Sequence, residues 1–299
     1  MGEVIEAVVR RELFVGLATG AIAAVACAVA ALVLRRRLLP VAGLAVAAAF
    51  LAAIRPPAPV IVSIGLLALL GIAADLRPGL IPWAGVLAIG PALLLVFAGE
   101  AFEPLWGRIA GVAAIALGGG LAAWSEQRRP LSWAGPVLAA GSALGVFLVV
   151  PDTERALVLF GATLPVALLG WPLRLARLGA GGALSFFGVL VWVVLRDGAT
   201  RGSAIVGGLA ALGVLVAEPV AALLSRVISG RWSSPRADWV LVAAHAVVVL
   251  LAARLAGTLD SAEDAALVAG LVLAGAVALL TVADLRPPEP GEAAGHGPR

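Results

Sequence analysis

The sequence predicts an all-α, polytopic integral membrane protein, folded as a helical bundle of about eleven transmembrane helices. Hydrophobic residues fill 62% of its 299 positions, charged residues fill 13%, and the mean hydropathy is +1.08. An average soluble domain is roughly 45 to 50% apolar and about 25% charged, so this composition excludes a soluble fold. Long apolar runs joined by short polar segments are the second observation that supports this fold class.

Each predicted helix corresponds to an apolar run long enough to cross a bilayer. The runs fall at about 13–34, 38–54, 58–75, 79–98, 105–124, 131–150, 156–174, 179–196, 202–225, 238–257 and 264–283. Helices satisfy their backbone amides internally in lipid, whereas an open sheet does not, and the alternation of a membrane barrel is absent. Merging or dropping one of the short early runs gives ten spans. We expect residues 1–285 to form a single transmembrane domain and residues 286–299 to be a disordered cytoplasmic tail.

The arginines predict the orientation in the membrane. Arginine supplies all 21 basic residues, and most fall in loops that would share one side. The positive-inside rule makes that side cytoplasmic, with the N-terminus outside and the C-terminus inside. Arg10 and Arg11, just before the first run, would instead place the N-terminus in the cytoplasm. They therefore favour the ten-span alternative. Because the arginines are scattered, we predict no nucleic-acid partner, and the dominance of alanine, leucine, glycine, valine and arginine indicates a bacterial plasma membrane protein.

Two ionisable residues lie deep within predicted spans, Glu218 and His245. Each stands about seven residues from the cytoplasmic end of its run, roughly 10 Å deep at about 1.5 Å per residue, so the two side chains could face each other. Pro219 predicts a kink beside the carboxylate, and many transporters build their sites at broken helices. We predict a pair that binds a proton or a substrate. The alternative is a hydrogen bond that only joins two helices.

A second candidate is the external loop that carries Asp152, Thr153, Glu154 and Arg155. Its carboxylates, hydroxyl and guanidinium could bind a cation or a lipid headgroup. The alternative is a turn in which Asp152 or Thr153 caps the next helix and Glu154 favours the helix dipole.

Small and aromatic residues predict how the helices pack and where they end. Pairs such as Gly16 with Gly20 and Gly141 with Gly145 have the spacing of close helix crossings. Tryptophans lie near the predicted span ends, as an interfacial belt requires. They are Trp83, Trp106, Trp124, Trp133, Trp171, Trp192, Trp232 and Trp239.

Catalytic patterns are weak in this chain. The run Asp75–Pro82 resembles the first aspartate motif of the membrane-embedded prepilin peptidases, in which an aspartate near a span end precedes Ile-Pro. The second motif of that family, Gly-x-Gly-Asp, is missing, so an aspartyl mechanism lacks its partner carboxylate. The histidines His245 and His296 form no zinc motif, and no nucleophile set has a plausible spacing. We therefore predict no catalytic residue, no metal site and no cofactor.

These observations leave three classes of function open. The first is a secondary transporter or lipid-type carrier for a small-molecule or lipid-linked substrate, coupled to an ion gradient or to a separate ATPase because no ATP-binding motif is present. The second is a non-catalytic scaffold or accessory subunit of an envelope-building complex, favoured by the scarcity of deep polar residues. The third is a membrane-embedded enzyme that acts on a lipid-linked substrate at the external face.

Overall fold

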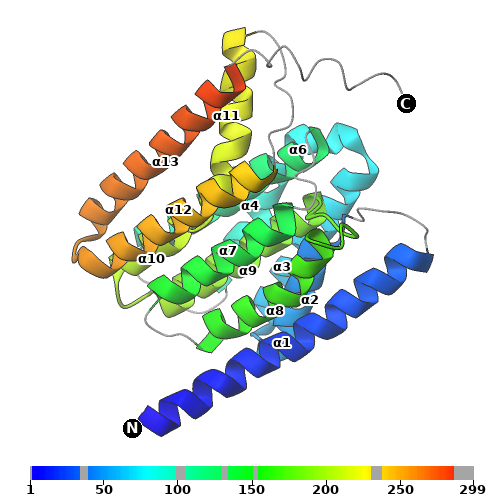
Figure 1. The fold of residues 1–299 in the computed structure, drawn as a ribbon, viewed down its shortest axis with the longest axis vertical. Helices are drawn as coiled ribbons and strands as arrows, with labels where there is room; N and C mark the ends of the chain where they lie inside the picture. The colour runs from blue at the N-terminus through cyan, green and yellow to red at the C-terminus, as the bar shows by residue number, and fades with distance from the viewer. Residues whose placement is uncertain are drawn as a thin grey trace.

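The computed structural model describes residues 2–33, 40–98, 105–128, 134–150, 154–229 and 238–285, and this part of the chain is all-α (Figure 1). The predicted tail at 286–299 lies outside these ranges. The helices are α1 (Gly2–Val33), α2 (Ala42–Ile54), α3 (Ala58–Leu76), α4 (Ile81–Ala98), α5 (Leu105–Ala113), α6 (Gly120–Arg128), α7 (Ala134–Val149), α8 (Glu154–Gly170), α9 (Ala180–Asp197), α10 (Gly202–Ala210), α11 (Gly213–Ser229), α12 (Asp238–Thr258) and α13 (Ala262–Leu285). A π-helical stretch, Ala114–Gly119, joins α5 to α6.

The number of membrane spans differs from the sequence prediction. Within the described ranges, 6 helices are long and apolar enough to cross a membrane, or 7 if the bent α10–α11 pair is one span. The expectation of eleven or ten spans is therefore wrong. The physical reason is helix length: the run at 38–54 yields a helix of 13 residues and the run at 131–150 one of 16 residues. An apolar run shows where lipid-compatible sequence lies, but not where the helix within it begins and ends.

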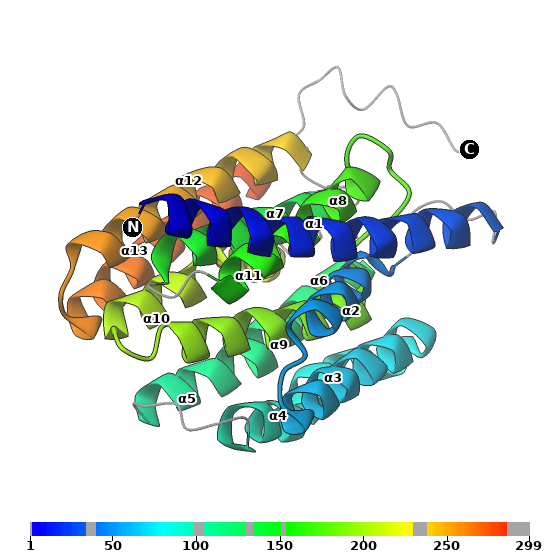
Figure 2. The same cartoon turned by 90° about the horizontal axis from the view of Figure 1, so that it is seen from below.

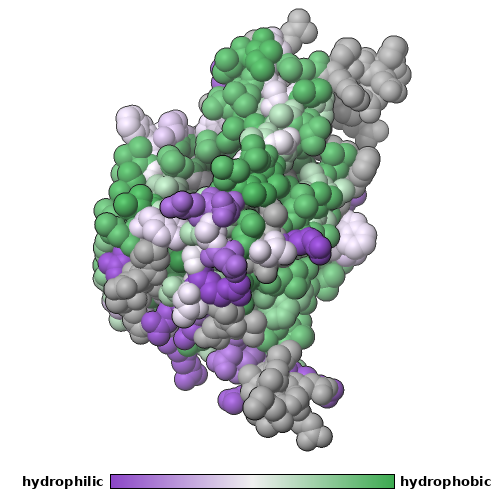
Figure 3. Space-filling view, turned by 90° about the vertical axis from the view of Figure 1, so that its left-hand side faces the viewer, coloured by the Kyte–Doolittle hydropathy of each residue, from purple (hydrophilic) through white to green (hydrophobic). Residues whose placement is uncertain are grey.

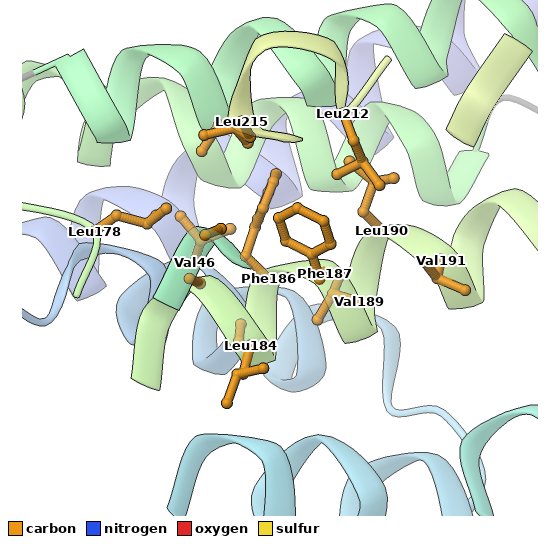
Figure 4. Packing of buried hydrophobic residues seen from close by; sticks show 14 of the residues in the cluster. Val46, Leu178, Leu184, Phe186, Phe187, Val189, Leu190, Val191, Leu212 and Leu215 are labelled. Carbon is orange, nitrogen blue, oxygen red and sulfur yellow. The ribbon is translucent and has the colours of Figure 1, made fainter. Parts of the chain in front are cut away.

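Helix α9 lies at the centre of the bundle, and 94% of its residues are buried. It passes between α3, α4 and α5 on one side and α7 and α8 on the other (Figure 2). Its aromatic residues Phe186 and Phe187 lie close to Leu212 and Leu215, which flank the start of α11 (Figure 4). The hydrophobic core is therefore built around one helix that has almost no contact with the surroundings.

The outer helices expose apolar side chains instead of burying them. Leu32, Leu69, Leu250, Leu271 and Leu279 are all more than half exposed. Figure 3 shows one side of the molecule on which hydrophobic residues cover much of the surface and hydrophilic residues gather near its middle. Large exposed apolar surfaces mark contact with lipid. Together with the candidate spans, they show a multi-pass helical protein in contact with a lipid bilayer.

The predicted glycine packing is confirmed where α1 crosses α8. A Cβ on Gly16 would stand 2.4 Å from the carbonyl oxygen of Val158, and one on Gly20 would stand 2.5 Å from that of Ala162. Gly161 of α8 meets the backbone of α1 in the same way. Because only a hydrogen fits at these positions, the two backbones approach more closely than larger side chains would allow.

The structure describes some of the tryptophans of the predicted belt, which stays a prediction for those that are exposed. Trp83 and Trp171 are well exposed, as interfacial anchors require. Trp192 is only 3% exposed and packs edge-on against Phe50, with ring centroids 6.1 Å apart, so its assignment to the belt is wrong. Trp133, Trp232 and the side chain of Trp239 lie outside the described part of the chain.

Gly16→Ala should destabilise the protein, because the added Cβ would collide with the backbone of α8. Overpacking of this kind costs about 1 to 3 kcal/mol, so the midpoint of thermal unfolding in detergent should fall. The buried thiol of Cys27, which is the one cysteine of the sequence, can report unfolding through a thiol-reactive dye. Gly65→Ala is the matched control, since no neighbouring described atom lies within 4 Å of its added Cβ. Equal midpoints would contradict the tight crossing.

Candidate functional site

A helix break lies in the middle of the predicted run 202–225. Helix α10 ends at Ala210, α11 begins at Gly213, and the two axes differ by 55°. Gly213 has a φ of 24°, which a residue with a Cβ adopts only with strain. The sequence predicted a kink at Pro219, but α11 continues through Pro219 and the break comes six residues earlier, at glycine.

His245 fills the space between this break and α7. A Cβ on Gly213 would stand 3.7 Å from Nδ1 of His245, while one on Gly141 would stand 2.7 Å from Cδ2. The ring therefore fits against α7 because residue 141 is glycine, and it lies in contact range of the break at Gly213. Nε2 lies 3.2 Å from Oγ of Ser142, and Nδ1 has no hydrogen-bond partner among the described residues. The side chain is only 2% exposed, so a polar nitrogen is buried beside a break in the backbone.

Glu218 lies on the other side of the same break, in α11. Its Oε2 accepts a hydrogen bond of 2.7 Å from Oγ of Ser125 in α6, and the residue is 3% exposed. Glu218 is thus hydrogen-bonded to Ser125 of α6, whereas His245 contacts Ser142 and the backbone of Leu138, both in α7. The role of these two residues as a proton or substrate site stays a prediction.

Two acids that the sequence analysis did not place in the interior hold the start of α9. Oε2 of Glu126 accepts hydrogen bonds from the backbone N–H of Gly179 at 3.1 Å and from Nη1 of Arg177 at 3.3 Å. The carboxylate of Asp75 accepts from the N–H groups of Ala180 and Gly181 at 3.3 and 3.2 Å. The first amides of a helix have no partner within the helix, and the helix dipole favours negative charge there.

Glu126 is a buried ionisable group that the sequence did not single out. Glu126 is fully buried, although it follows the predicted run 105–124 and resembles an interfacial residue in the sequence. Its partners lie 51 to 53 residues further along the chain, so no local pattern could have identified them. Asp75, noted above for its resemblance to an aspartyl-protease motif, binds helix amides in this structure.

The external cluster is only partly within the described residues. Asp152 and Thr153 lie outside them, and Glu154 begins α8. Nη1 of Arg155 forms an ion pair of 2.5 Å with Oδ1 of Asp197, whose side chain is fully buried at the end of α9. The same guanidinium lies 5.7 Å from the ring centroid of Trp192. Arg155 therefore has a structural partner, and a cation or headgroup site in this loop stays a prediction.

Apolar hollows on the described part of the bundle include the following pair. One has a volume of about 470 Å³ between α7, α8 and α12, with His245 in its wall. The other has a volume of about 420 Å³ between α4, the π-helical stretch, α6 and α11. Both volumes fall within the range of small-molecule sites, roughly 300 to 1,000 Å³. Their walls are almost entirely hydrocarbon, so neither suits a small charged solute.

The chemistry available at His245 is proton exchange and hydrogen bonding. A serine nucleophile needs a histidine base that a third group orients through its second nitrogen, and Nδ1 has no such partner in the described ranges. Ser142 is also fully buried and lies outside the wall of the hollow. In the same ranges, no group of three or more His, Cys, Asp or Glu side chains could hold a metal ion.

Glu126→Ala should lower the stability of the whole bundle, because the amide of Gly179 and the guanidinium of Arg177 would lose a charged acceptor. Hydrogen bonds to charged groups contribute about 1.5 to 3 kcal/mol each, so the shift should exceed that of a surface substitution. Glu263→Ala, at an exposed position in the first turn of α13, is the matched control. The measurement is loss of the folded, monodisperse fraction on heating. Equal losses for both variants would show that Glu126 does not hold α9.

No protein-family model matches the chain, and the comparison with curated proteins finds no similar sequence. The features of this chain that bear on its function are therefore the break at Gly213, the buried groups beside it and the apolar hollow along α12.

Proposed function

We propose that this chain is a secondary transporter or lipid-type carrier of a bacterial plasma membrane. The observation that carries the proposal is the break between α10 and α11, with the buried Nδ1 of His245 facing it. Broken helices expose backbone carbonyls and amides at membrane depth, where only protein, water or a ligand can satisfy them. Transporters use such breaks to bind the polar part of a substrate or a coupling ion.

The imidazole of His245 beside the break can either donate or accept a hydrogen bond. A neutral imidazole carries one N–H donor and one acceptor nitrogen, so Nδ1 of His245 can accept from or donate to a group at Gly213. Small residues on both sides keep the ring in place without filling the break. A passing substrate would therefore find one oriented polar atom in an otherwise apolar wall.

Glu218 provides a candidate for coupling to a proton gradient. Its carboxylate is buried five residues after Gly213, on the helix that the break frees to move, and Ser125 donates a hydrogen bond to it. Ionisable groups within membrane helices commonly form proton relays. A change in the α10–α11 angle would alter the distance between Glu218 and Ser125, which links proton binding to helix position.

The positions of the arginines support the proposed orientation. Hydrogen bonds that Asp75 and Glu126 accept from backbone amides bring the ends of α3 and α6 to the start of α9. Arg77 and Arg177 belong to this end of the bundle, and we propose that it faces the cytoplasm, with the N-terminus of the chain outside. The Arg155–Asp197 pair lies at the opposite end of α9 and would face outward.

Thiol labelling tests whether the break is hydrated. In a Cys27→Ala background, His245→Cys and Ser142→Cys would be exposed in turn to a membrane-impermeant thiol reagent in intact membranes. We expect labelling at position 245, because a transport site must open to water in at least one state. A cysteine side chain is close in size to the serine at position 142. The Ser142→Cys variant should therefore keep the native packing even where His245→Cys disturbs it.

Two further cysteines calibrate that experiment. Val189→Cys on buried α9 should stay protected, and Asp260→Cys at an exposed position should label fully. Protection at 142 and 245, with full labelling at 260, would mean a dry helix contact. That result would contradict transport and would favour the scaffold.

A further inference from the structure

The hollow between α7, α8 and α12 opens toward the surroundings through exposed apolar side chains. Leu168, Trp171 and Leu250 line it and are 54%, 55% and 62% exposed. Its inner wall includes Phe160 and the ring of His245. On a bundle whose outer surface contacts lipid, a groove of this composition is accessible from the hydrocarbon and excludes charged occupants. A hydrocarbon chain fits both the volume and the wall.

Arg174 follows closely in the chain on the residues that line one end of this groove. After α8 the backbone turns back on its last residues: the N–H of Leu173 bonds the carbonyl of Leu168 at 3.2 Å, and that of Arg174 bonds Gly170 at 3.0 Å. Arg174 is therefore held within one turn of Leu168 and Trp171. Its side chain is exposed, and its guanidinium has no hydrogen bond or ion pair with any described residue. This arginine differs from Arg155 and Arg177, which both bind carboxylates.

We propose that the groove binds an anionic phospholipid, with one acyl chain between α7, α8 and α12 and the phosphate on Arg174. The apolar wall accounts for the chain, and the arginine at its end accounts for the charge of the headgroup. Arg174 also belongs to the end of the bundle assigned above to the cytoplasm, where the leaflet is rich in anionic lipids.

This inference rests on the proposed function in one respect: if the chain is a lipid-type carrier, the groove names its substrate class as anionic phospholipids. His245 lines the groove and also lies beside the break at Gly213, so a chain bound in the groove would contact its ring. Lipid binding in the groove and hydration of the break are measured in separate experiments. One of the two hypotheses can therefore be contradicted while the other stands.

Native mass spectrometry of the detergent-purified full chain tests the proposal, with phosphatidylglycerol and phosphatidylcholine of identical acyl chains added in equal amounts. We expect the wild type to bind phosphatidylglycerol about fivefold more tightly, the contribution of one basic residue near a membrane surface. Arg174→Gln should reduce this ratio to about one. Arg201→Gln, an exposed arginine at the far end of α9, should retain it.

A second pair of variants tests the acyl-chain part of the site. Ala246→Trp fills the groove from an exposed position in its wall and should weaken binding of both lipids. Ala243→Trp, exposed on the same helix but outside the wall, should leave binding unchanged.

Three results would overturn the proposal. They are equal binding of the two lipids by the wild type, an unchanged ratio in Arg174→Gln, and displacement of the lipid by glycerol 3-phosphate, which would indicate a phosphate site without a chain. Failure of lipid binding with position 245 still labelled would remove the substrate class but leave the proposed transport function.

Discussion

The amides at the start of α9 need acceptors that the helix itself cannot supply, and α9 is buried along almost its whole length. Water cannot serve them in the interior, where an unsatisfied polar group costs about 1 to 3 kcal/mol. Asp75 of α3 and Glu126 of α6 accept hydrogen bonds from these amides, and the guanidinium of Arg177 balances the negative charge of Glu126. Because both acids must reach the same few amides, the ends of α3 and α6 are fixed relative to α9. The arrangement of the bundle follows from this contact, and the hydrophobic packing fills the space around it.

Sequence alone predicts the properties that depend on composition and short spacing. The all-α membrane fold follows from apolar content, and the α1–α8 crossing follows from Gly16 and Gly20, which lie one helical turn apart. The number of long helices could not be predicted, because apolar residues occur in helices, breaks and turns alike when all of them lie in lipid or protein. Glu126 could not be recognised because its partners lie 51 to 53 residues further along the chain, and Trp192 is buried because neighbouring helices cover α9 along almost its whole length. Glu218 and His245 could be selected as candidates because an ionisable residue within a long apolar run is recognisable in a single sequence. Their serine partners could not, because those contacts depend on the fold.

The polar groups beside the break are satisfied to different degrees. Glu218 has a short hydrogen bond from Ser125, whereas His245 has a longer contact with Ser142 and a second nitrogen with no described partner. A helix contact selected only for stability would satisfy both nitrogens or replace the histidine by an apolar residue, because a buried unpaired polar atom is costly. A group that binds a transient partner must instead be left incomplete in the resting state. Nε1 of Trp192 and Oδ2 of Asp197 are also buried without a hydrogen-bond partner among the described residues, so the open Nδ1 supports the proposed role of His245 only together with the adjacent break at Gly213.

The groove and the break are physically linked through the imidazole ring. Gly141 leaves no space for even a methyl group on one side of the ring, and a Cβ on Gly213 would stand at ordinary contact distance from Nδ1 on the other, so the ring is closely packed. A change in the angle between α10 and α11 would press on the ring and hence on α12, which forms one wall of the groove. A chain bound between α7 and α12 would oppose that movement, and its departure would permit it. Close packing around one side chain would thus couple occupancy of a lipid site to the angle of a broken helix, with no need for a separate regulatory element.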